Sequence, residues 1–204
     1  MRLLIATTNR HKVREIRQLL DGIPLELGTL ENWPAVKAPD ETGRTFEENA
    51  RSKALYYAAA TGELTVAEDS GLEIDALDGA PGVESARYGG EQTTYPTKFA
   101  LIYDALRAKR AMESPARFVC ALALARDGRV LFETRGTVEG RVAAAPKGTG
   151  GFGYDPIFFY PPYGCTLGEA TEEEKSAVSH RGNAFRALRR FLQAFDSEGR
   201  LEKP

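Results

Sequence analysis

Apolar positions near the N-terminus follow one strand-like pattern and then two helix-like patterns. Residues 2–7 form a β-prone apolar run, and Asn9 directly after it can cap a helix. The apolar face of this helix consists of Val13, Ile16, Leu19 and Leu20. A second helix is predicted to begin after its cap Thr45 and to end at Gly62, with an apolar face of Phe46, Ala50, Ala54 and Ala58. A strand that leads through a polar turn into a helix can present backbone N–H groups to an anion.

The next patterns favour extended structure. Residues 26–40 contain several prolines and Trp33, and are expected to form a loop or a short strand. Residues 65–68 read as a buried strand, which we expect to end at Asp69-Ser70-Gly71. One or both of the carboxylates Glu68 and Asp69 could then face a cleft at the end of this strand.

The second half of the chain interleaves both kinds of element. A helix is predicted to start at Thr94 or Tyr95, and the β-prone runs 116–126 and 129–142 are joined by Asp127-Gly128, a strong hairpin signal. A strand at 157–160 and a short helix capped by Thr171 follow. The last helix has an apolar face of Ala184, Phe185, Leu188, Phe191, Leu192 and Phe195. This order predicts an α/β fold with a mixed sheet and no dividing linker.

Composition narrows the range of functions. With 204 residues, 42% of them hydrophobic, the chain can bury one sizeable core, so we expect a single domain over residues 1–204, possessing two lobes at most. The net charge of -2 provides no basic field for a nucleic acid. No apolar run is long enough for a signal peptide or a membrane span, so we expect a cytoplasmic protein. Cys120 and Cys165 are far apart and are expected to be reduced structural thiols.

The stretch "GTGGFGYDP", residues 148–156, is the first candidate for chemistry. Gly148, Gly150 and Gly153 match the dinucleotide-binding spacing, but the strand-like residues after Pro156 leave no helix to receive a pyrophosphate. A tight turn that needs glycine is one interpretation. Phe152 favours the other, because a ring flanked by glycines has little local core to enter and can stack on a planar base.

Two further groups of residues carry candidate chemistry. Glu68-Asp69 could hold Mg²⁺ and orient a water molecule, although a solvated acidic turn is the commoner role of such a pair, and the same holds more strongly for Glu41. His180-Arg181 stands where the last helix begins, so the pair could bind an anion or donate hydrogen bonds to a carbonyl. Such a pair alone is more often a surface feature, and His11 is expected to be an exposed turn residue.

Six motifs in order give the chain a close resemblance to the inosine/xanthosine triphosphate pyrophosphatases. They are Thr7 to Lys12, Glu68 to Leu72, Gly79 to Gly82, Ser85 to Tyr88, Gly148 to Pro156, and Ser179 to Gly182. The resemblance extends from about Leu3 to Phe195. It implies an elongated mixed sheet flanked by helices, two lobes with a central nucleotide cleft, and a homodimer. It also implies Mg²⁺-dependent hydrolysis of a nucleoside triphosphate to the monophosphate and pyrophosphate.

The resemblance also implies roles for individual residues. A phosphate-binding loop would consist of Thr7, Thr8, Asn9, Arg10, His11 and Lys12. Lys53 and Lys175 match further cationic positions, and Ser70 matches a substrate contact. Asp69 matches the catalytic acid, which binds metal and activates water, and Glu41 matches a second metal-associated acid.

The base-binding part of the family site is matched as well. Its loop corresponds to Phe152, Gly153, Tyr154 and Asp155, and His180 and Arg181 match the pair at the purine edge. The chain departs from the family pattern at two places. Many members have Thr-Gly-Asn in place of Thr7-Thr8-Asn9, and Asp-Asp-Ser-Gly in place of Glu68-Asp69-Ser70-Gly71, which leaves the role of Glu68 open.

These residues are compatible with one mechanism and two alternatives. Lys12, Lys53, Lys175 and Mg²⁺ can neutralise phosphoryl oxygens while Asp69 holds the attacking water. Arg181 is always a hydrogen-bond donor. It should therefore favour the 6-oxo group of hypoxanthine or xanthine, which accepts a hydrogen bond, and disfavour the 6-amino group of adenine. The protein would then remove deaminated purine nucleotides. The alternatives are a pyrophosphatase for another altered nucleotide, such as a modified pyrimidine, and a nucleotide sensor that does not hydrolyse its ligand.

Overall fold

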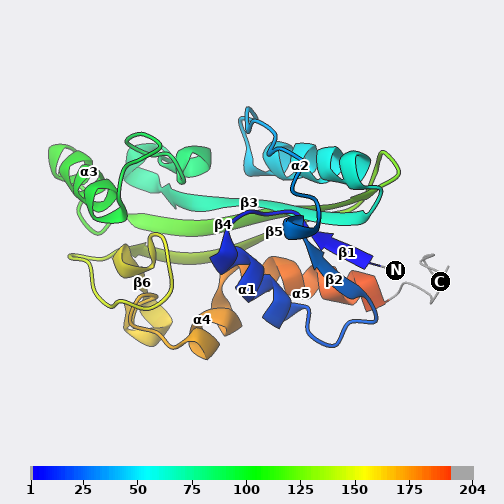
Figure 1. Ribbon diagram of the computed structural model, residues 1–204. Coiled ribbons are helices and arrows are strands. Elements are labelled where there is room, and N and C mark those ends of the chain that lie inside the picture. The colour runs from blue at the N-terminus through cyan, green and yellow to red at the C-terminus, as the bar shows by residue number, and fades with distance from the viewer. Residues whose placement is uncertain (1, 194–204) are drawn as a thin grey trace. The chain divides into compact units, whose positions relative to one another are not determined.

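The expected α/β architecture with a mixed sheet is confirmed by the computed structural model, which describes residues 2–193 (Figure 1). Its seven described strands form one sheet in the order β2-β1-β3-β4-β5-β6-β7, parallel for β2-β1-β3 and antiparallel for β5-β6-β7. The strands are β1 (Arg2–Ile5), β2 (Glu26–Thr29), β3 (Leu64–Ile74), β4 (Pro115–Arg126), β5 (Arg129–Val142), β6 (Phe158–Tyr160) and β7 (Cys165–Thr166). The α-helices are α1 (Arg10–Leu19), α2 (Phe46–Thr61), α3 (Tyr95–Ala108), α4 (Glu172–Val178) and α5 (His180–Gln193).

The chain divides into two compact units. The described part of unit 1 comprises residues 2–69, 120–136 and 181–193, and unit 2 comprises residues 70–119 and 137–180. Neither unit is a continuous segment, because the chain changes unit after residues 69, 119, 136 and 180. None of the helices within residues 2–193 combines the length and the apolar character that a membrane span needs.

Unit 1 has helices on both faces of its strands. In Figure 1, α2 covers one face, and α1 and α5 cover the other. Alternate strand side chains point to opposite faces, so one set of apolar residues packs with α1 and α5. This cluster includes Leu3, Ile5, Ile16, Leu20, Leu64, Val66, Leu122, Leu124, Phe185, Leu188 and Leu192. The apolar face predicted for the last helix is thereby confirmed, apart from Phe195, which lies outside the described residues.

Small side chains occupy part of the opposite face of unit 1, beside the larger Leu4, Phe46 and Tyr57. Ala50, Ala54 and Ala58 on the buried side of α2 are at most 3% exposed. Several strand residues that alternate with the first cluster are also small, namely Ala67, Ala121, Ala123 and Ala125. Alanines on both sides allow the helix backbone to approach the sheet closely.

Unit 2 has its own core. Its buried residues come from α3, the second half of β3, β4 and the strands that follow the glycine-rich stretch, and they include Leu72, Ile74, Phe99, Ile102, Leu106, Phe118, Ile157 and Phe158. The rings of Phe118 and Phe158 lie with their centroids 4.5 Å apart. Phe158, the first residue of β6, is therefore part of the core of unit 2.

Most local predictions are confirmed, and one is wrong. Asn9, Thr45 and Thr171 cap helices through their side chains, and Asp127-Gly128 turns the hairpin with positive φ values of 50° and 72°. The predicted strand end at Asp69-Ser70-Gly71 is wrong, because β3 continues to Ile74. Gly71 is required there by close packing rather than by a turn, since a Cβ atom would lie 2.3 Å from Oγ of Ser85.

Because α2 packs closely on the sheet, a larger side chain should destabilise the protein on the buried side of this helix but not on its exposed side. Ala54→Leu should lower the free energy of unfolding by about 1–3 kcal/mol, because the buried face has no room for three further carbons. The same change at the exposed Ala59 on this helix should alter it by less than about 0.5 kcal/mol. Urea unfolding of both variants measures the difference, and equal midpoints would contradict the close packing.

Candidate active site

Two successive carboxylates of unit 1, Glu68 and Asp69, leave β3 toward opposite faces of the sheet. Glu68 Oε1 accepts hydrogen bonds from Arg181 of α5 at 2.9 and 3.1 Å and lies 3.1 Å from Nζ of Lys12 in α1. Asp69 Oδ2 accepts a hydrogen bond of 2.9 Å from the side-chain amide of Asn49 in α2. Adjacent positions on the strand therefore serve two different clusters.

The cluster around Glu68 is a buried charge network. Arg181 is 1% exposed, and its Nη1 also donates to Glu15 at 2.7 Å. Burial by itself would raise the pKa of Glu68, but the charges of Arg181 and Lys12 outweigh it and hold this pKa well below its ordinary value. Glu68 is thus held ionised at neutral pH, and its charge is balanced by two cations.

The cluster around Asp69 is built on α2. The Nζ atom of Lys53 lies 2.6 Å from Oε1 of Glu41 and 3.6 Å from Oδ1 of Asp69, so one ammonium is shared by two carboxylates. Asn49 is held in place because its Oδ1 accepts a 2.8 Å hydrogen bond from the backbone of Gly43. Burial raises the pKa of Asp69, although Lys53 and Asn49 oppose the shift. The pKa values of these two neighbouring acids are thereby shifted in opposite directions, and Asp69 is the one that takes up a proton more readily.

The carboxylates of Glu41 and Asp69 fit a metal that is completed by a ligand. Within residues 2–193, no group of three or more His, Cys, Asp or Glu side chains could enclose a metal ion. Mg²⁺ commonly uses one or two carboxylates together with water and substrate phosphates. The shared ammonium of Lys53 marks a place where the two carboxylates already attract a cation. The donor set therefore suits Mg²⁺ bound together with a phosphate ligand.

The predicted phosphate loop uses much of its hydrogen-bonding capacity to start α1. Oδ1 of Asn9 accepts from the backbone N–H groups of His11 at 2.9 Å and Lys12 at 3.3 Å. Oγ1 of Thr7 accepts from the backbone of Asn9 at 3.2 Å. His11 is exposed, as expected from the sequence. Recognition of an anion would therefore depend on side chains such as Arg10 and Lys12, of which Lys12 belongs to the Glu68 cluster.

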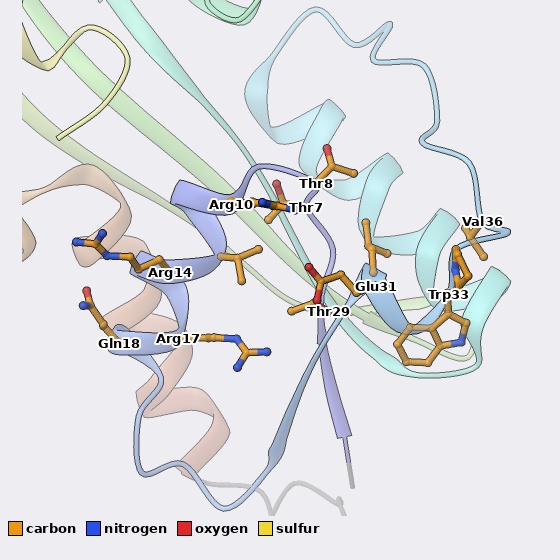
Figure 2. A pocket seen from close by; sticks show the side chains of 13 residues that line it. Thr7, Thr8, Arg10, Arg14, Arg17, Gln18, Thr29, Glu31, Trp33 and Val36 are labelled. Carbon is orange, nitrogen blue, oxygen red and sulfur yellow. The ribbon is translucent and has the colours of Figure 1, made fainter.

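A groove of about 840 Å³ lies beside this loop in unit 1, between α1 and the segment after β2 (Figure 2). It is lined by Thr7, Thr8, Arg10, Val13, Arg14, Arg17, Gln18, Thr29, Leu30, Glu31, Trp33, Pro34 and Val36. Figure 2 shows Arg17 extending from α1 toward Glu31, with Trp33 beyond it. Within the described residues, Arg10 and Arg17 form no ion pair. The sequence interpretation missed Arg17, although three arginines at positions 10, 14 and 17 share the spacing of one helix face.

The glycine loop, residues 148–156, is organised in unit 2 by Asp155. Its Oδ2 accepts hydrogen bonds from the backbone of Phe152 at 2.7 Å and from Nζ of Lys175 at 2.6 Å. The same ammonium lies 4.5 Å from the centre of the Phe152 ring. A Cβ atom at Gly151 would lie 2.1 Å from this carboxylate, so the bare backbone is what lets Asp155 enter the loop. Lys175 thus contacts this loop.

The remaining predicted residues have distinct surroundings. Tyr154 is buried and donates to the backbone carbonyl of Ser85 at 2.8 Å, and Ser70 is half-buried in β3. His180 is 6% exposed and stacks on Phe118 with a centroid distance of 4.9 Å. Arg181, its neighbour, belongs to unit 1 and binds carboxylates there. A contact of His180 or Arg181 with a purine edge stays a prediction.

Comparison with known proteins identifies the family. The Ham1 family model matches residues 3–191. The chain belongs to the Ham1 family. A protein named dITP/XTP pyrophosphatase from Exiguobacterium sibiricum is 43% identical over 198 residues, which cover 97% of this chain and 100% of that protein. A protein of the same name from Geobacter sulfurreducens is 45% identical, with 94% and 96% covered. The family resemblance inferred from the sequence is confirmed.

Solved structures of Ham1 proteins share the fold. A HAM1 protein from Coxiella burnetii has a TM-score of 0.89 and 37% identity, and the match covers 95% of this chain and 98% of the other. A Mycobacterium abscessus structure named nucleoside-triphosphatase and dITP/XTP pyrophosphatase has a TM-score of 0.74 and 40% identity, with 92% and 98% covered. Both matches span nearly the whole chain.

The depressed pKa of Glu68 predicts how stability depends on pH. Glu68→Gln should lower the free energy of unfolding by about 3 kcal/mol or more at pH 7, because it leaves the buried charge of Arg181 only partly balanced. Since the folded-state pKa lies below the unfolded value of 4.5, the contribution is complete above that pH. It is lost as the pH falls toward the folded-state pKa, so the difference between wild type and variant should shrink in acid.

Urea unfolding at pH 7, 5 and 4 measures this difference. Glu26→Gln serves as the control, because Glu26 forms an exposed pair with Arg2 and should cost no more than about 1 kcal/mol at any of these pH values. Equal costs for the two variants at pH 7 would contradict a stabilising role of the buried network.

Proposed function

We propose that the protein hydrolyses non-standard purine nucleoside triphosphates, ITP, dITP, XTP and dXTP, to the monophosphate and pyrophosphate. The observation that carries the proposal is the Asp69 cluster, in which Lys53 joins Asp69 to Glu41. The relatives' name, dITP/XTP pyrophosphatase, supports the same reaction. By this activity the protein would clear deaminated purines from the nucleotide pool, as a homodimer in the cytoplasm.

Asp69 is assigned the role of activating the attacking water molecule. Its burial raises its pKa, so the carboxylate is a better proton acceptor than an exposed aspartate would be. Asn49 fixes one of its oxygens and leaves Oδ1 directed toward Lys53. The carboxylate can therefore orient a water molecule for in-line attack on a phosphoryl group and accept its proton.

The triphosphate is assigned to the cations of unit 1. Lys12 can turn to a phosphate at low cost, because Arg181 still balances Glu68 when Lys12 leaves. Arg10 and Thr8, which line the groove, provide further donors. Mg²⁺ held by Glu41 and Asp69 would neutralise phosphoryl oxygens and polarise the anhydride. These groups stabilise the charge that develops on the leaving pyrophosphate.

The purine base is assigned to the glycine loop. The ammonium of Lys175 lies against the Phe152 ring, the proposed stacking surface for the base, and helps to hold that ring in place. Asp155 holds Phe152 and Lys175 next to each other, because its carboxylate accepts a hydrogen bond from each. Arg181 and His180 are proposed as the donors that select a 6-oxo group over a 6-amino group.

A panel of triphosphates tests the function, with pyrophosphate release as the measurement. ITP, XTP and their deoxy forms should be turned over with Mg²⁺, and ATP should be disfavoured because it lacks the 6-oxo acceptor. Asp69→Asn should fold and bind ITP but lose at least about 100-fold in kcat. Glu63→Gln, directly before β3 and outside both clusters, is the control and should retain activity.

Each alternative has its own outcome in this assay. Preferred turnover of a modified pyrimidine would indicate a pyrophosphatase for another altered nucleotide. Tight binding of ITP without release of pyrophosphate would indicate a sensor. Near-normal turnover by Asp69→Asn would contradict the role proposed for the Asp69 carboxylate.

Stacking on Phe152 predicts a loss of substrate recognition. Phe152→Ala should lower kcat/KM for ITP by the equivalent of about 1–3 kcal/mol, because the base loses its platform. Phe152→Tyr keeps the ring and should remain close to wild type. Steady-state kinetics with ITP measure both variants, and an unchanged kcat/KM for the alanine variant would show that the ring has only a structural role.

A further inference from the structure

Lys98 in α3 is a buried lysine that forms no ion pair with a carboxylate of residues 2–193. Only 2% of its surface is exposed. Its Nζ atom donates to the backbone carbonyl of Ala86, and to that of Ser85 at 3.4 Å, and it lies 5.0 Å from the centre of the Tyr95 ring. Burying an ammonium is costly unless its donors are satisfied, and an apolar side chain would fill the same space without that cost. The charge therefore calls for a specific explanation.

Ser85 is the junction at which several segments of unit 2 meet. Its Oγ accepts from the backbone of Leu72 in β3 at 3.0 Å and donates to the carbonyl of Gly82 at 2.6 Å. Its own carbonyl accepts from the Tyr154 hydroxyl at 2.8 Å as well as from Lys98. Two donors from different segments thus converge on one carbonyl oxygen.

Tyr154 connects this junction to the glycine loop. The residue is 4% exposed, and its ring packs edge-on against Tyr95 with centroids 5.3 Å apart. Its hydroxyl bond to Ser85 ties the buried ring of the loop to a segment of unit 2 that is distant in sequence. Displacement of the Ser85 carbonyl would therefore move Tyr154, and with it the neighbouring Phe152.

We propose that Lys98 is a positioning residue for purine recognition, acting through the Ser85 carbonyl and Tyr154 on the glycine loop. An ammonium has three donors and can hold two successive carbonyls at once. This role rests on the proposed function, because it assumes that the loop binds the base. Lys98 itself does not contact the substrate.

The role predicts a change in KM that a purely structural lysine would not cause. Lys98→Met should raise KM for ITP about tenfold and leave kcat within about twofold, because the Ser85 carbonyl that holds Tyr154 loses a charged hydrogen bond while the Asp69 cluster keeps its own contacts. Lys98→Arg, which retains the charge and donors, should restore much of the affinity. Ile102→Ala is the matched control: Ile102 is fully buried one turn further along α3, and its loss should lower the melting temperature without changing KM.

Three outcomes would overturn the role of Lys98. They are an unchanged KM in Lys98→Met, an equal rise of KM in Ile102→Ala, and the same KM in the methionine and arginine variants. If Lys98→Met does not fold, Tyr154→Phe tests the same connection by deleting only the hydroxyl. A raised KM then supports the proposal, and an unchanged KM overturns it.

A double-variant cycle tests whether both residues act through one carbonyl. Because Lys98 and Tyr154 donate to the same oxygen, Lys98→Met combined with Tyr154→Phe should raise KM by less than the product of the two single effects. A fully multiplicative effect would show independent roles and contradict the proposed connection.

Hydrogen exchange separates this proposal from the proposed function. In Lys98→Met the amides of residues 152–155 should exchange faster than in wild type, and in Ile102→Ala they should not. If wild type fails to hydrolyse ITP, the proposed function fails, but this measurement still tests the positioning role. Unchanged exchange in Lys98→Met would reject it whatever the substrate is.

Discussion

The alternation of side chains along β3 is the constraint on which the unit 1 site depends. Glu68 and Asp69 are neighbours in the chain, yet one is directed to the helices α1 and α5 and the other to α2. The first meets two cations and is held ionised, while the second is buried with one shared ammonium and an amide. A single strand thus shifts the pKa values of two adjacent carboxylates in opposite directions.

Each lysine predicted to face phosphate already has an anionic partner in the protein. Lys12 is paired with Glu68, Lys53 with Glu41 and Asp69, and Lys175 with Asp155. Under the proposed function, nucleotide binding is consequently an exchange of partners. Such an exchange is feasible where the abandoned carboxylate keeps another cation, as Glu68 keeps Arg181, or gains one, as Asp69 and Glu41 would from Mg²⁺.

Local signals in the sequence predicted the caps, the hairpin turn and the family, because Asn9, Thr45, Thr171 and Asp127-Gly128 act on their immediate neighbours. The prediction at Gly71 failed for a tertiary reason. Its missing side chain makes room for Ser85, which is distant in sequence, so the same residue type that signals a turn here permits an unbroken strand. The partners of Arg181 and Lys98 could not be predicted either, because contacts between residues that are distant in sequence do not produce a recognisable spacing pattern.

The row of alanines between α2 and the sheet has a consequence for how this protein can evolve. Asn49 and Lys53 reach Asp69 only because the helix that carries them lies close to the strands, and displacements near 1 Å can cost an enzyme about 100-fold in rate. Filling core space with larger side chains can raise stability, but along this seam it would move Asn49 and Lys53 away from Asp69. Lineages adapting to higher temperature would have to leave the seam small and gain their stability elsewhere in the molecule.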